Sequence, residues 1–61
     1  MKDKVEKALA LADQLGEVFN GLVKEADDLD LKRMFKQLEA DMMDTRHKLA
    51  LAIKIIAADK G

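Results

Sequence analysis

The chain has 61 residues, of which 49% are hydrophobic and 38% charged, and its formal net charge is −1. Sixty-one residues form at most one domain, and the near balance of 12 acidic and 11 basic residues excludes a strong general attraction to nucleic acid or anionic lipid. Because the chain has no cysteine, neither a disulfide nor a thiolate metal site can stabilise it. So small a domain buries little apolar surface alone, so we expect stability to come from association.

A first helix is expected over about residues 3–29, with Asp3 as its N-terminal cap. Gly16 and the Asn20-Gly21 pair weaken it, since a glycine inside a helix costs about 1 kcal/mol relative to alanine. The apolar spacing nevertheless continues through them without a slip, so the helix is predicted to be continuous, with Asn20 and Gly21 facing outward. The steps of three and four residues define a first apolar seam: Val5, Ala8, Ala12, Leu15, Phe19, Leu22, Ala26 and Leu29.

A turn is expected at about residues 28–31, where the acidic run from Asp27 to Asp30 interrupts the seam. Asp28 or Asp30 can cap the second helix, because negative charge is favourable at a helix N-terminus. That helix is predicted over about residues 31–59. Its apolar seam is Leu31, Phe35, Leu38, Met42, Thr45, Leu49, Ala52 and Ile56.

Two arms of nearly equal length joined by a short turn are typical of an antiparallel helical hairpin. The sequence therefore predicts an all-α fold, a single domain over residues 1–61 that dimerises into a four-helix bundle. The residues of both seams form the predicted dimer core, where small residues on one helix face large ones on the other. The relative orientation of the two hairpins stays open.

Nine further apolar residues exceed what the seams require, and most of them flank a seam: Leu9, Leu11, Val18, Val23, Met34, Met43, Leu51, Ile53 and Ile55. The candidate partner patch consists of Leu9, Leu11, Met43, Leu51 and Ile55. They are concentrated toward the open end of the predicted hairpin, where residues 48–58 are apolar nearly all round, as in a buried helix. One interpretation is a thick core completed by the second protomer. The alternative is a patch that binds another protein. A helix lying on a membrane surface is a third option, with only two lysines flanking the stretch.

Metal binding and catalysis find little support in the residue types. Asp44 and His47 form an acid and histidine pair at i, i+3, which with Glu17 resembles a partial ligand set of the ferritin-like di-iron bundles. The register, however, turns all three toward solvent. With one histidine and neither serine nor cysteine, the nucleophile and base pairs of acyl transfer cannot be built. We predict no catalytic residue, no cofactor and no metal site.

The segment Glu6–Ala12, followed by Leu15, Leu22 and the turn at Leu29-Asp30, resembles the Rop family of small plasmid-copy-number regulators. The resemblance implies a homodimeric antiparallel four-helix bundle, and it implies an RNA-contacting face on the outer side of the first helices. The positions that match this face are Asp3, Ala10, Gln14, Val18 and Glu25.

Of those positions only Gln14 suits RNA contact, because phosphates require cations and two of the matching residues are acidic. Lys32, Arg33 and Lys36 cluster after the turn and are the remaining basic candidates. The functional prediction is a non-catalytic structural or protein-interaction module that binds itself, with a further protein partner as an option. A Rop-like RNA regulator and a ferritin-like metal-binding half-bundle are the alternatives.

The chain start lacks an apolar signal core, and no run of about 18 apolar residues occurs. The sequence therefore predicts a cytoplasmic protein without membrane contact.

Overall fold

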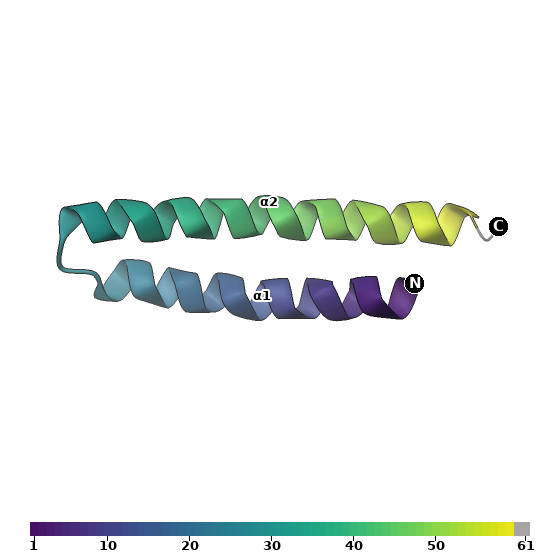
Figure 1. The fold of residues 1–61 in the computed structure, drawn as a ribbon, viewed down its shortest axis with the longest axis horizontal. Coiled ribbons are helices and arrows are strands. Elements are labelled where there is room, and N and C mark those ends of the chain that lie inside the picture. Colours follow the sequence, from purple (N-terminus) through teal and green to yellow (C-terminus); the bar gives the residue numbers. More distant parts are fainter. Residues whose placement is uncertain (60–61) are drawn as a thin grey trace.

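The computed structural model describes residues 1–59 as two antiparallel α-helices that lie side by side, as the hairpin prediction requires (Figure 1). Helix α1 spans Lys2–Glu25 and helix α2 spans Leu29–Asp59. The hairpin measures 50 × 14 × 12 Å, and α2 runs past the start of α1 at the open end (Figure 1). Over the described residues, neither helix carries an apolar stretch that could cross a membrane.

Helix α1 is continuous through Gly16 and the Asn20-Gly21 pair, which confirms the reading of its heptad spacing. Its beginning differs from the prediction. Met1 is the residue before the first turn, and no side chain caps that end, so the predicted Asp3 cap is wrong. Asp3 lies inside the first turn, where its negative charge is still favourable to the helix dipole.

The turn comes earlier than predicted and consists of Ala26, Asp27 and Asp28. Helix α1 ends at Glu25 because Ala26 adopts an extended backbone conformation. Asp28 then caps α2: its carboxylate accepts a hydrogen bond from the Leu31 N–H at 3.1 Å. With the cap at Asp28, Leu29 and Asp30 belong to the first turn of α2, so this helix begins two residues before the predicted start.

The two helices leave most of their apolar surface incompletely covered. Among residues 1–59 only Ala12 and Val23 are buried, with 6% and 7% of their surface exposed. Ten seam residues are half-buried: Val5, Ala8, Phe19, Leu22, Ala26, Phe35, Met42, Leu49, Ala52 and Ile56. Five are exposed: Leu15, Leu29, Leu31, Leu38 and Thr45. One helix-to-helix interface therefore covers only part of the predicted core.

The residues that flank the seams explain why the seams are only partly covered. Leu9, Gly16 and Val23 each follow a seam residue of α1 by one or four positions, and all three are half-buried or buried. Ile53 occupies the corresponding position on α2 and is half-buried. Each helix thus presents its seam and one flank to the other helix, and the opposite flank remains uncovered.

Candidate functional site

One side of the hairpin is a nearly continuous apolar surface, which we call the apolar face. Its centre is a shallow, open hollow of about 400 Å³. The residues lining the hollow are Ala8, Leu11, Ala12, Leu15, Met42, Thr45 and Leu49. Leu22, Val18, Leu38 and Ala52 extend this face, because each lies one heptad from a residue of the hollow and therefore on the same side of its helix. Surfaces of this kind are typical of interaction sites.

Among the described residues, Thr45 is the only polar one that lines the hollow, and its hydroxyl group already has a hydrogen-bond partner. The Thr45 hydroxyl donates a hydrogen bond to the backbone carbonyl of Asp41 at 2.9 Å, within the same helix. Covering a polar group is costly only when that group has no partner. The apolar face can therefore be covered completely without leaving this hydroxyl unpaired.

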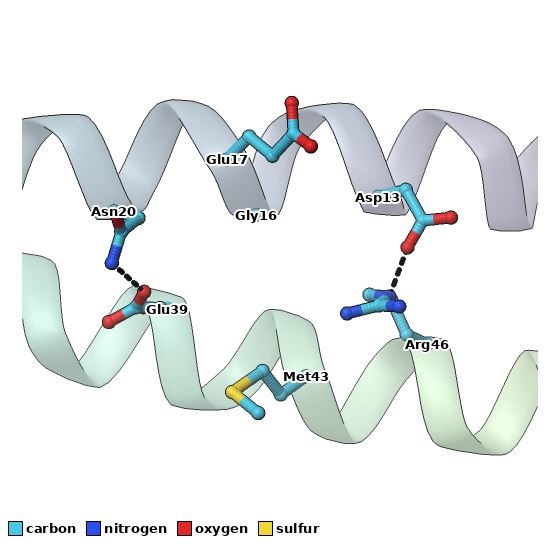
Figure 2. Close-up of a pocket in the computed structure, with 7 residues that line it drawn as sticks. All are labelled: Asp13, Gly16, Glu17, Asn20, Glu39, Met43 and Arg46. Carbon is cyan, nitrogen blue, oxygen red and sulfur yellow. Dashed lines mark hydrogen bonds and ion pairs between the residues drawn. The ribbon is translucent and has the colours of Figure 1, made fainter.

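The opposite side, which we call the polar face, carries the contacts that join the two helices through polar groups. The guanidinium of Arg46 pairs with the carboxylate of Asp13, and the side-chain amide of Asn20 donates to Glu39 at 2.7 Å (Figure 2). Asn20 was predicted to face outward. It is instead half-buried against α2, because this flank of α1 is the one that α2 covers.

Between these two links Gly16 forms a notch, with Glu17 pointing away from α2 and Met43 alongside (Figure 2). The open hollow there measures about 320 Å³. The Asp13 and Arg46 side chains are each about half exposed, at 49% and 46%. An ion pair with that exposure stabilises by at most about 1 kcal/mol. Its main consequence is for the alignment of the two helices, because the ion pair favours one position of α2 along the axis of α1.

The structure divides the five residues considered as a partner patch. Leu11 lines the hollow of the apolar face, whereas Leu9 and Met43 border a shallow hollow on the other side with Asp13 and Arg46. Leu51 and Ile55 are exposed and line neither hollow. These five side chains therefore do not form one continuous surface.

The metal candidates remain apart from any ligand cluster. Glu17, Asp44 and His47 are all exposed, and Asp44 forms an ion pair with Lys48 at 3.1 Å. Among residues 1–59, no group of three or more histidine and acidic side chains is placed to hold a metal ion. Chemistry at these positions would therefore need ligands from elsewhere.

The positions that match an RNA-contacting face are all exposed: Asp3, Ala10, Gln14, Val18 and Glu25. Lys32, Arg33 and Lys36 are likewise exposed, on the first two turns of α2. The acidic residues at both ends of the first set keep phosphates unfavourable there.

Comparison of the chain with protein-family models, curated proteins and solved structures gives no match. The resemblance to the Rop family thus rests on architecture, and the two-helix hairpin is compatible with that fold.

Proposed function

We propose that this chain is a non-catalytic structural module that dimerises through its apolar face into a four-helix bundle. The observation that carries the proposal is the contrast between the two sides of the hairpin. Polar links between the helices occupy one side, while Leu15, Leu38 and Thr45 of the predicted core are exposed on the other.

The proposal is also supported by how little the hairpin buries alone. Only Ala12 and Val23 are buried among the described residues, and neither is a large side chain. Two helices with such a core are marginal in water, because helices in proteins gain most of their stability from packing an apolar face. A second copy on the apolar face supplies the missing contacts.

Catalysis has no place in this proposal, because the hollows of the hairpin are open and shallow. The apolar hollow has only the Thr45 hydroxyl as a polar side-chain group, and that group is engaged within its own helix. Binding pockets for small substrates are usually enclosed and carry several converging polar groups.

Sedimentation equilibrium at micromolar concentration tests the proposal with a matched pair of variants. Leu15→Lys places a charge on the apolar face, and Met43→Lys places the same charge on the polar face. Both parent residues are already partly exposed in the hairpin, at 42% and 60%. We expect a dimer for the parent chain and for Met43→Lys, and a largely unfolded monomer for Leu15→Lys. A parent chain that sediments as a folded monomer would refute the proposal.

A further inference from the structure

The polar links fix how the two seams line up within one hairpin. Asp13 and Arg46 form an ion pair. The residues just before them, Ala12 and Thr45, therefore lie opposite each other along the hairpin axis, and both line the hollow. Asn20 and Glu39 are linked by a hydrogen bond, one residue after Phe19 and Leu38. Stepping along both seams from these positions gives a ladder of facing pairs: Val5 with Ala52, Ala8 with Leu49, Ala12 with Thr45, Leu15 with Met42, Phe19 with Leu38, and Leu22 with Phe35.

This ladder is unequal in size from one end of the hairpin to the other. The three pairs toward the open end each contain at least one alanine, and the pair of Ala12 and Thr45 is the smallest. The three pairs toward the turn contain only large side chains, including both phenylalanines. The hollow of the apolar face extends over the small pairs of Ala8 and Ala12, which is where the missing volume lies.

Two hairpins can meet through their apolar faces with the turns at the same end or at opposite ends. With the turns at the same end, Ala12 and Thr45 of both copies would meet and leave a void, while the large pairs would crowd one another. With the turns at opposite ends, every small pair meets a large pair. Because bundle cores are packed without voids or overlaps, the second arrangement is the favourable one.

The row of exposed residues that borders the apolar face gives an independent criterion. These border residues each precede a seam residue and repeat every seven positions: Lys4, Leu11, Val18 and Glu25 on α1, and Met34, Asp41, Lys48 and Ile55 on α2. In a bundle with antiparallel neighbours, border residues of adjacent helices lie next to each other, so their chemistry should match.

The two arrangements pair these residues differently. Turns at opposite ends place α1 beside α1 and α2 beside α2, which pairs Lys4 with Glu25, Leu11 with Val18, Asp41 with Lys48, and Met34 with Ile55. Turns at the same end place α1 beside α2, which pairs Lys4 with Ile55, Leu11 with Lys48, Val18 with Asp41, and Glu25 with Met34. The first set consists of ion pairs and apolar pairs, whereas every pair of the second set joins a charge to an apolar side chain.

We propose that the occupant of the apolar face is a second copy whose turn lies at the opposite end, and that ion pairs between the copies, Lys4 with Glu25 and Asp41 with Lys48, select this orientation. The inference rests on the proposed dimer and adds its geometry. Two-fold symmetry forms each ion pair twice. Within one hairpin Lys48 pairs with Asp44 at 3.1 Å, and the Asp41 carboxylate accepts a hydrogen bond from the Gln37 amide at 2.9 Å. Both contacts are exposed, so each group can also bind a partner in the second copy.

Distances between spin labels test the orientation. Because the chain has no cysteine, one introduced cysteine places a single label at a chosen position. Asp27→Cys places the label in the turn, and Gln14→Cys places it at mid-length as the matched control. In the proposed dimer the labels at Asp27 are about 40 Å apart, because each lies about 13 residues from the centre at 1.5 Å per residue. The labels at Gln14 are close together in the proposed dimer, because α1 then lies beside α1 and Gln14 is near mid-length in both copies. With the turns at the same end the two α1 helices are diagonal in the bundle, so the Gln14 labels and the Asp27 labels are both separated by about the width of the bundle.

Each combination of results has one meaning. A short distance at Gln14 with a long one at Asp27 supports the proposal. Similar distances at both sites, each about the width of the bundle, overturn the orientation and leave the dimer intact. The absence of any distance between copies at either site, at concentrations well above micromolar, overturns the dimer itself, and the inferred geometry with it.

Charge reversal tests the selecting ion pairs. Lys48→Glu alone, and Asp41→Lys alone, should each raise the dimer Kd by roughly five-fold, because like charges then face each other across the interface. The double variant Asp41→Lys, Lys48→Glu should recover most of the affinity. Residues 41 and 48 are two helical turns apart and do not contact each other within one helix. Asp44 lies within reach of both positions on the same helix, so all of these variants carry Asp44→Asn, and recovery then arises between copies. If the double variant is as weak as the product of the single variants, the ion pairs do not act.

Discussion

The apolar and polar faces of this hairpin differ in what each leaves unfinished. On the polar face the ion pair of Asp13 and Arg46 and the hydrogen bond from Asn20 to Glu39 are complete within one chain. On the apolar face Leu15 and Leu38 belong to the heptad seams, yet both are exposed. The difference indicates that one apolar seam can serve two interfaces. The first is the contact between α1 and α2, which the hairpin forms, and the second is the apolar face, which the hairpin leaves exposed.

The largest effect should come from a charge at a residue that both interfaces need. Leu49 is half-buried between the helices and also lines the hollow of the apolar face. Leu49→Asp should cost about 3 kcal/mol or more, since it removes an apolar side chain and introduces an unpaired charge. We expect loss of helical circular dichroism at 25 °C. His47→Ala, an exposed neighbour, is the control and should change the melting temperature little.

A sharper version of the comparison uses two leucines with equal exposure. Leu38 on the apolar face and Leu51 on the outer side of α2 are 42% and 43% exposed in the hairpin. If a second copy covers the apolar face, Leu38→Ala should cost about 2 kcal/mol or more, while Leu51→Ala should stay within about 0.5 kcal/mol. Urea unfolding of both variants measures the difference. Equal costs would indicate that nothing covers the apolar face.

The sequence was sufficient to predict the hairpin but not the two faces. The continuous heptad spacing correctly carried α1 through the Asn20-Gly21 turn signal, because a packed seam outweighs a local preference. Val18 and Val23 show where this information ends. Both are valines beside the seam, yet Val23 is 7% exposed and Val18 is 57% exposed. Which flank becomes covered depends on the side toward which α2 folds, and the spacing along one helix does not encode that side.

The candidate site had a similar outcome. The seam residues that form the apolar face were identified from their spacing, whereas the links of the polar face were not. Asn20 was assigned outward, and its partner Glu39 is nineteen residues away in the chain. A polar pair at such a separation gives no periodic signal in the sequence. Only the alignment of the two helices along the hairpin axis shows that the two residues are neighbours. That alignment depends on the turn, and the start of the turn was predicted two residues too late.

A moderate gain in stability is expected from replacing the glycines of α1, which lie away from the apolar face. A Cβ atom at Gly21 would meet nothing within 4 Å, and one at Gly16 would lie 3.7 Å from the Met42 Cγ, an ordinary contact. Gly21→Ala and Gly16→Ala should each stabilise the protein by about 1 kcal/mol through helix propensity. Thermal melts measure the gain. A loss at Gly16 alone would show that the notch of the polar face requires a closer approach of α2.

The smallest effect should come from the ion pair of the polar face. A double-mutant cycle of Asp13→Asn and Arg46→Gln should give a coupling free energy of about 0.5 kcal/mol, because both side chains are about half exposed and screened by solvent. Salt should reduce this coupling, since ions screen exposed charges. The same cycle should leave the dimer Kd unchanged in sedimentation, because the polar face lies away from the proposed interface. A coupling well above 1 kcal/mol, or a change in Kd, would mean that the polar face is also covered in the assembled protein.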